Sequence, residues 1–332
     1  MSAPTASLAS ILGDDELSII DIGARGSLAG QLMPIAASVN VIGFEPDEAE
    51  CTRLNAALAQ QSPWRSARVL PVAVGRTAKD RDFFIAREAV LSSLLRPNPD
   101  YSESFRDQVV EVVKLDTVSL DDLYKQGVLS ETIDFIKVDT QGSELEILQS
   151  GETHILPAVL AIEVEAEFAE MYAQQPRFSE IEQYLRQQGF EFLTLQPRYS
   201  YAAMHDIEAT KRRMTFCDAV FMRGRAWLAA LTPEERARNL TRLATLHASY
   251  GLIGEAIELV RNYDKPLEQK LRDYAQQVAQ PRFRWRGRLL ISALRCALNP
   301  SRRNRLLLAR SALMYGNRSG ERWQLQDIHK ST

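Results

Sequence analysis

The sequence contains few residues of the kinds that bind metals or form disulfides, with three cysteines and four histidines among 332 residues. The cysteines are scattered and form no Cys-x-x-Cys pair, which argues against a disulfide framework or a structural zinc site. No window of about 18 uncharged apolar residues is present, so we expect no membrane-spanning helix. The N-terminal residues also lack the basic start and apolar stretch of a secretory signal. These absences favour a protein of the reducing cytoplasm.

Apolar runs typical of buried β-strands alternate with helix-like segments over the first two thirds of the chain. The predicted strands cover residues 17–21, 39–44, 68–74, 133–138, 157–164, 190–195 and 216–222, and the predicted helices between them include 27–37, 47–58 and 179–188. This alternation predicts an α/β fold with a mostly parallel sheet covered on both faces. We expect the last two strands, which a long polar insertion separates, to pair antiparallel. Asp47 is the predicted N-cap of its helix, with Glu50 as its capping-box partner.

Acidic residues lie at the ends of four predicted strands: Asp21, Glu45, Asp139 and Glu163. Parallel sheets of this kind bind ligands at the carboxyl ends of their strands. We therefore expect the four carboxylates to face a common ligand site.

The turn at residues 21–26, Asp-Ile-Gly-Ala-Arg-Gly, brings backbone close to a ligand because Gly23 and Gly26 carry no side chain. A nicotinamide site would use the spacing Gly-x-Gly-x-x-Gly, which this turn lacks. The carboxylate of Asp21 would repel a pyrophosphate and attract a cofactor with a positive sulfonium and ammonium. Glu45, at the end of the next strand, can accept hydrogen bonds from both hydroxyls of a ribose. The pattern predicts a site for S-adenosylmethionine.

Five segments together resemble the FkbM family of methyltransferases in order and spacing. They are Ile-Asp-Ile-Gly-Ala-Arg-Gly at 20–26, Gly-Phe-Glu-Pro at 43–46, Ser-Ser-Leu at 92–94, Ile-Asp-Phe-Ile-Lys-Val-Asp-Thr-Gln-Gly-Ser-Glu at 133–144, and Asp-Ala-Val-Phe at 218–221. The chain departs from the family at Arg25, where Asn is frequent, and at Gln141, where Glu is frequent. The resemblance implies a seven-stranded class I (Rossmann-like) methyltransferase sheet and methyl transfer from S-adenosylmethionine to a hydroxyl, commonly of a sugar or polyketide-type acceptor.

The predicted cofactor contacts come from the turn, the second strand end and the third apolar run. They are Asp21, Gly23, Ala24, Arg25, Gly26, Glu45, Pro46 and Ala73. A nucleotide-sugar or NAD-dependent enzyme on a similar sheet is one alternative. A methyltransferase fold that serves as an interaction scaffold is the other.

Methyl transfer requires the acceptor oxygen to lie in line with the methyl group, and a group that takes up the hydroxyl proton. We expect Asp139 in that region. Lys137 is two residues before it on the same strand face, where it can keep Asp139 ionised or contact acceptor oxygens. His205, in the polar insertion, is the third catalytic candidate because an imidazole is a serviceable base. A structural ion pair and a solvated loop histidine are the plainer alternatives.

Asp139 and Glu163 could instead hold a Mg²⁺ ion, which binds few protein carboxylates and keeps its waters. On the acceptor side, the family resemblance implies that Ser92 and Ser93 line the site. Glu163 and Tyr201 are further candidates, since Tyr201 could stack on a sugar ring. The irregular segment 89–108 around the serines is a candidate lid or binding loop.

Residues 281–332 carry twelve basic and two acidic residues, although the whole chain has a net charge of −3. No strand pattern is present after residue 226, so we expect a methyltransferase domain at 1–225 and a helical extension at 226–332. The basic amphipathic tail could pack on the acidic body of the chain or on a second copy, as in a homo-oligomer. It could also lie on an anionic membrane at the inner face, where lipid-linked glycans occur. Nucleic acid is the least favoured partner because no recognisable binding module is present.

Overall fold

The computed structural model describes residues 7–26, 28, 30–101, 108–130, 132–196 and 214–279. Residues Leu8–Lys265 form one compact unit. Helix α10 (Lys265–Ala279) makes up nearly all that is described of the second unit. The domain boundary at residue 225 stays a prediction, and the basic tail at 281–332 lies outside the described residues.

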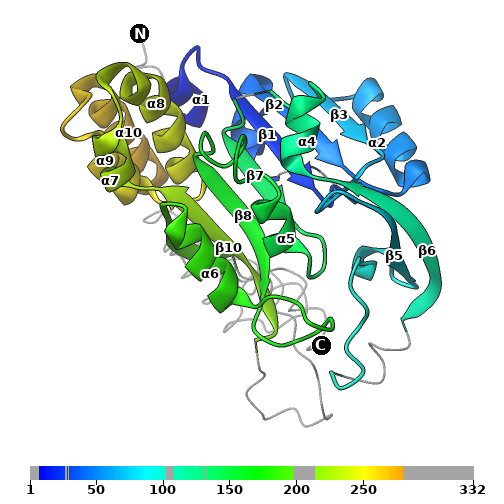
Figure 1. Ribbon diagram of the computed structural model, residues 1–332. Helices are drawn as coiled ribbons and strands as arrows, with labels where there is room; N and C mark the ends of the chain where they lie inside the picture. The colour runs from blue at the N-terminus through cyan, green and yellow to red at the C-terminus, as the bar shows by residue number, and fades with distance from the viewer. Residues whose placement is uncertain are drawn as a thin grey trace, which may run out of the picture. The chain divides into compact units, whose positions relative to one another are not determined.

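A seven-stranded sheet forms the centre of the larger unit, as predicted (Figure 1). Its strands are β1 (Leu17–Ile22), β2 (Val39–Phe44), β3 (Ser66–Leu70), β7 (Phe135–Val138), β8 (Ala161–Glu167), β9 (Phe190–Gln196) and β10 (Phe216–Arg223). The spatial order is β3-β2-β1-β7-β8-β10-β9. Neighbouring strands from β3 to β8 are parallel, whereas β10 is antiparallel to both β8 and β9. The expected antiparallel pairing of the last two strands is therefore confirmed.

The helices of this unit follow the predicted alternation with one difference. They are α1 (Leu8–Leu12), the 3₁₀-helix η1 (Gly30–Ser38), α2 (Glu48–Gln60), the short 3₁₀ turn η2 (Ala89–Leu91), α4 (Leu120–Lys125), α5 (Glu144–Gln149), α6 (Phe178–Gln187), α7 (Arg225–Ala230), α8 (Pro233–Ser249) and α9 (Ile253–Val260). The helix predicted at 27–37 is a 3₁₀-helix that contains Pro34, which has no backbone N–H to continue an α-helical ladder.

Asp47 caps α2 as predicted, because its side chain accepts hydrogen bonds from the backbone N–H groups of Ala49 and Glu50. The predicted capping box is wrong. The Glu50 carboxylate instead accepts a bond from Gly26 N and pairs with Arg53. The N–H of Asp47 donates to Glu45 Oε1, which ties the helix start to the predicted ribose-binding acid.

A second, three-stranded sheet was missed by the sequence interpretation. It has the order β4-β6-β5, from β4 (Ala73–Val74), β5 (Ala78–Ala86) and β6 (Val109–Val118). The run predicted as one strand at 68–74 is split between β3 and β4 around Pro71, because proline cannot donate to a strand ladder. The β5–β6 pair flanks the loop that carries Ser92 and Ser93, so the irregular segment is held between two paired strands.

The two faces of the seven-stranded sheet differ in chemistry. One face packs against α4, α5 and α6 in an apolar core that includes Ile162, Val164 and Ala166 of β8 (Figure 1). Because side chains alternate along a strand, the glutamates between and after them point to the opposite face. Directly paired neighbours share that face, including Lys137 opposite Glu163 and Asp218 opposite Glu165. The sheet therefore has one apolar face, and its opposite face carries a cluster of charged residues beside buried apolar ones such as Ile19 and Phe135.

Among the described residues, no helix is both long and apolar enough to cross a membrane.

Candidate active site

Gly23 is required by the backbone around it. Its φ is +83°, and a Cβ at this position would lie 1.9 Å from the carbonyl oxygen of Asp139. The N–H groups of Gly23 and Ala24 both donate to Phe44 O, at 3.0 and 3.1 Å. The turn thus joins the ends of β1, β2 and β7. Gly26 also has a positive φ, +92°, but a Cβ there would meet no atom within 4 Å.

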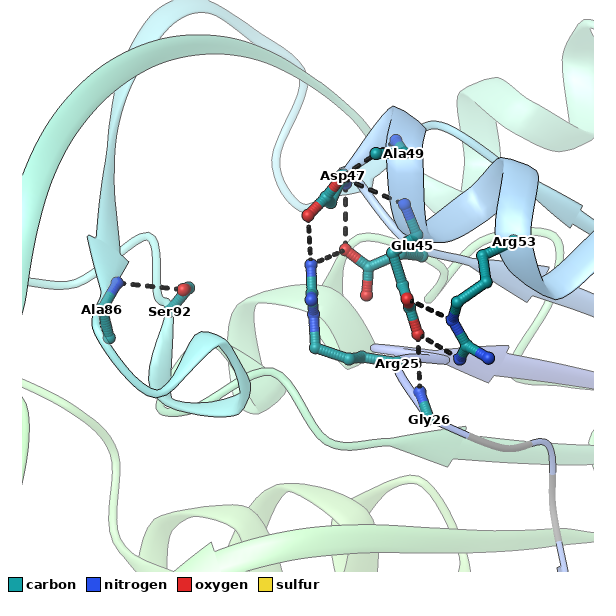
Figure 2. Close-up of polar contacts among 9 residues, drawn as sticks. Arg25, Gly26, Glu45, Asp47, Ala49, Arg53, Ala86 and Ser92 are labelled. Atoms are coloured by element: carbon teal, nitrogen blue, oxygen red, sulfur yellow. Dashed lines mark hydrogen bonds and ion pairs between the residues drawn. The ribbon is translucent and has the colours of Figure 1, made fainter.

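Glu45, directly after β2, is buried, and one of its two carboxylate oxygens accepts hydrogen bonds (Figure 2). Its Oε1 accepts hydrogen bonds from Asp47 N at 2.9 Å and from the Arg25 guanidinium at 3.3 Å. Arg25 pairs more closely with Asp47, at 2.6 Å. Burial raises the pKa of Glu45, against the opposing effects of the Asp47 N–H and Arg25. The hydrogen bonds of Glu45 with Asp47 and Arg25 both involve Oε1, so Oε2 is the atom that could accept from a ribose.

Lys137 places a positive charge between the ends of β1 and β7. Its ammonium lies 3.6 Å from Asp21 Oδ1 and 3.7 Å from Asp139 Oδ2. Asp21 is completely buried, whereas the Asp139 side chain keeps about a fifth of its surface exposed. Burial disfavours the charged ammonium, but the surrounding carboxylates outweigh it and raise the pKa of Lys137. Lys137 is therefore a fixed cation here and not a proton acceptor.

Three glutamates of β8 face the same side as Lys137. Glu163 had been expected at the strand end, but β8 continues to Glu167, so Glu163 lies in mid-strand. Its Oε2 accepts a 2.6 Å hydrogen bond from Tyr250, which follows α8. Burial raises the pKa of Glu163 to about 7. Burial also holds the pKa of Glu165 and Glu167 well above the usual range, with neighbouring carboxylates adding to the effect.

In the described part of the chain, two clusters of three carboxylates each are compact enough to bind a cation. One comprises Asp139, Glu165 and Asp218, and the other comprises Glu144, Glu165 and Glu167, with ligand atoms within 4.8 Å of one another. Glu163 belongs to neither group. Its hydrogen bond to Tyr250 and the Lys137 charge beside it leave the predicted pair of Asp139 and Glu163 a poor fit for Mg²⁺.

The two serines of the candidate acceptor loop have different roles. Ser92 Oγ accepts a hydrogen bond from Ala86 N at 3.1 Å, which closes the turn after β5 (Figure 2). Ser93 is buried, and its hydroxyl donates to the carbonyl of Gln141 at 2.7 Å. The loop is thereby attached to the segment that follows β7.

The remaining predicted site residues are placed as follows. Ala24 is buried beneath the turn, Pro46 lies between Glu45 and the α2 cap, and Ala73 is buried in β4. His205 and Tyr201 lie outside the described residues, so their roles stay predictions.

Sequence reasoning missed Glu165, Glu167 and Tyr250. The alternation Glu-Val-Glu-Ala-Glu at 163–167 is a strand signal that could have located the two glutamates. No local signal could have located Tyr250, which is 87 positions from Glu163 in the chain.

Strand order, the antiparallel β10 and the glycine turn between two acidic strand ends define a class I methyltransferase. Residues 32–192 match the model of the methyltransferase FkbM domain. These residues therefore form a methyltransferase FkbM domain, as the resemblance implied, and the protein is an S-adenosylmethionine-dependent methyltransferase. The match favours this function over the NAD and scaffold alternatives. It includes Glu45, Lys137 and Asp139, whereas the 21–26 turn and Tyr250 lie outside it.

Solved methyltransferase structures are similar to the chain at low identity. A precorrin-6y C5,15-methyltransferase from Geobacter metallireducens is 11% identical with a TM-score of 0.35, covering 65% of this chain and 86% of that one. An rRNA methylase from Streptococcus thermophilus is 10% identical with a TM-score of 0.32, covering 65% and 91%. A fibrillarin/Nop5p complex chain is 11% identical with a TM-score of 0.36, covering 64% and 74%. No curated protein sequence matches the chain.

Proposed function

We propose that the protein methylates a hydroxyl of a neutral, hydroxyl-rich acceptor, such as a sugar of a glycan or of a lipid-linked glycan. The carboxylate group of Asp139, Glu165 and Asp218 at the end of the sheet carries the proposal. Carboxylates accept hydrogen bonds from hydroxyls and repel an anionic acceptor. The Ser92–Ser93 loop lies next to this group through its bond to Gln141.

In this reaction Asp139 takes up the proton of the acceptor hydroxyl. Its side chain is partly exposed at the end of β7, and Lys137 holds one of its oxygens. Glu45 accepts from the ribose of the cofactor, and Asp21 with Lys137 shapes the turn beneath it. S-adenosylmethionine supplies the electrophilic methyl group, which the acceptor oxygen attacks in line. His205 and Tyr201 remain candidates for contacts to the acceptor. We route no step through a metal ion.

The experiment combines binding and transfer. Calorimetry with S-adenosylmethionine and with NAD should detect saturable binding of the first alone, and Glu45→Ala should abolish it. Labelled S-adenosylmethionine incubated with extracted glycans and lipids should label a glycan-containing fraction. Asp139→Asn should bind the cofactor normally and transfer about 100-fold more slowly, as expected for loss of a general base. Full transfer by Asp139→Asn, or label in nucleic acid alone, would contradict the proposal.

For location, the basic segment at 281–332 supports a peripheral contact with an anionic membrane surface, since twelve of its residues are basic. The full-length protein should sediment with phosphatidylserine vesicles, and less so at high salt or after deletion of 281–332. Equal sedimentation by the deletion variant would exclude this role. A concentration-dependent mass in solution would instead support a homo-oligomer.

A further inference from the structure

The side chain of Gln141 lies between two carboxylates. Its Nε2 is 3.1 Å from Asp139 Oδ1 and also donates to Glu165 Oε2. Its Oε1 lies 3.1 Å from the hydroxyl of Tyr172, which can donate to it. In this amide orientation Nε2 has two carboxylate oxygens as acceptors and Oε1 can accept from the Tyr172 hydroxyl. Both N–H groups and the carbonyl oxygen of the Gln141 side chain are therefore engaged.

The backbone of Gln141 fixes the acceptor loop. Its φ is +63°, a left-handed conformation that a non-glycine residue adopts only when its surroundings hold it there. Its carbonyl accepts the bond from Ser93, and Ser93 Oγ in turn accepts from Leu95 N at 2.9 Å. The Tyr172 hydroxyl also lies 3.0 Å from Leu91 O. Segment 91–95 is thus attached to Gln141 through Ser93, and the single hydroxyl proton of Tyr172 is shared between Gln141 Oε1 and Leu91 O.

The charges around Gln141 explain why an amide suits this position. Its side chain contacts Asp139, which directly follows β7, Glu165 of β8, and Tyr172. Further carboxylates act on Glu165 itself: Asp139, Glu167, Glu144 and Asp218. Lys137 lies on the far oxygen of Asp139, so it does not separate Asp139 from Glu165. The neutral amide donates one N–H to each of these two carboxylates, so it holds both without adding charge.

We propose that Gln141 is a positioning residue that orients Asp139 for proton uptake and couples that orientation to the 91–95 loop. The proposal rests on the proposed role of Asp139 and goes beyond it by naming what aims its carboxylate. Lys137 holds Oδ2 and Gln141 holds Oδ1, so the carboxylate plane is fixed from both sides. Movement of the loop when an acceptor binds is transmitted to Asp139 through Ser93 and Gln141.

The test compares two substitutions that separate hydrogen bonding from packing. Gln141→Glu keeps the shape but replaces the donor by a carboxylate between two carboxylates. Gln141→Met removes the polar groups without adding charge. Gln174→Glu is the matched control, because Gln174 has the same backbone conformation, with φ +61°, and is exposed. Hydrogen–deuterium exchange of peptides within 84–96 is measured on the full-length protein with S-adenosylmethionine bound.

We expect Gln141→Glu to speed exchange in 84–96 about tenfold, because repulsion between the new carboxylate and Asp139 displaces residue 141 and weakens the bond from Ser93 to its carbonyl, which is worth about one order of magnitude. Gln141→Met should have a smaller effect, and Gln174→Glu none. Exchange in α2 should not change. A purely packing role predicts the reverse order, with the isosteric Glu tolerated and Met harmful. Either that order or unchanged exchange in Gln141→Glu overturns the proposal.

Transfer assays supply the second measurement. Gln141→Glu and Gln141→Met should lower the turnover of labelled methyl transfer about 10- to 100-fold, with the affinity for S-adenosylmethionine within about twofold of the parent. Loss of turnover and cofactor affinity together would assign Gln141 a general structural role and refute positioning. The exchange experiment needs no acceptor, so a wild-type protein that fails to label glycans contradicts the proposed function and leaves the loop result to be judged separately.

Discussion

At the carboxyl end of the sheet, the buried acids near the proposed cofactor position and those near the proposed acceptor position are held in different ways. On the cofactor side, Asp21 lies beside the ammonium of Lys137, and Glu45 lies beside the guanidinium of Arg25. On the acceptor side, Glu163 is held by the neutral hydroxyl of Tyr250 and Glu165 by the neutral amide of Gln141. A neighbouring cation opposes the effect of burial on a carboxylate, although burial still raises the pKa of Glu45 beside Arg25. Positive charge thus lies beside the acids of the cofactor side, whereas neutral donors hold Glu163 and Glu165 on the acceptor side.

The largest expected effect comes from a substitution at Gly23, in the turn that joins the ends of β1, β2 and β7. Gly23→Ala would place a Cβ 1.9 Å from Asp139 O at a backbone φ of +83°, so β1 and β7 must move apart. We expect a loss of at least about 4 kcal/mol in the free energy of unfolding, or no folded protein. Gly26→Ala is the control with a similar φ but open space, and should cost about 1–3 kcal/mol. Urea unfolding measures both, and equal costs would refute the steric account.

The next largest effect concerns the cation that lies between the two sides. Lys137→Met removes the ammonium that lies 3.6 Å from the fully buried Asp21 carboxylate. Removing one partner of a buried ion pair costs about 3–5 kcal/mol, and we expect a loss in this range by urea unfolding. Asp21→Asn in the same protein should recover most of it, because the uncompensated charge is then gone. No recovery in the double variant would show that Lys137 acts through packing.

The cofactor side could be predicted from the sequence because its parts are local. Asp21, Gly23 and Glu45 each follow a short apolar run directly, and a parallel sheet brings consecutive strand ends together. The same reasoning identified the main strands and the antiparallel pairing of the last two. It placed Lys137 on its strand and Asp139 directly at the end of that strand.

The acceptor side could not be predicted because its contacts depend on register and on distant packing. Acids in a strand usually signal solvent, so the β8 glutamates were interpreted as the end of the strand. In the structure β8 continues through these glutamates to Glu167, and their side chains are buried. Gln141 acts through side chains from β8 and from the loops at 91–95 and 172, and nothing in the local sequence pairs these segments. The β5–β6 pair was missed for the same reason, since charged residues interrupt both strands.

A smaller effect tests the acceptor side through its dependence on pH. Glu163 has a folded-state pKa of about 7, against an ordinary value of 4.5. The folded protein therefore binds a proton more tightly here than the unfolded chain does. The stabilisation is complete below pH 4.5 and is lost as the pH rises through 7. Glu163→Gln cannot lose it, so at pH 8 it should be more stable than the parent by on the order of 3 kcal/mol.

The measurement is the difference in unfolding free energy between Glu163→Gln and the parent at pH 5 and pH 8. It should be small at pH 5 and favour the variant at pH 8. Tyr250→Phe removes a bond that lowers the pKa of Glu163, so it should extend the loss of stability to higher pH. A constant difference across this range would mean that Glu163 keeps an ordinary pKa in the folded protein.

The smallest expected effect is at Asp47, where the cofactor side meets α2. Its side chain caps the helix through two backbone N–H groups and holds Arg25 at 2.6 Å, which keeps the guanidinium at the rim of Glu45. Asp47→Ala should cost about 1 kcal/mol through the lost cap. Asp47→Ser keeps a capping oxygen but loses the charge, so it should be nearly as stable as the parent. In both variants the ion pair with Asp47 is lost and, among the described residues, Glu45 is the ion-pair partner that remains to Arg25. We expect weaker binding of S-adenosylmethionine because the guanidinium then competes with the ribose. Calorimetry that finds unchanged affinity in both variants would show that Arg25 does not compete for Glu45, and that the cations of this side only balance charge.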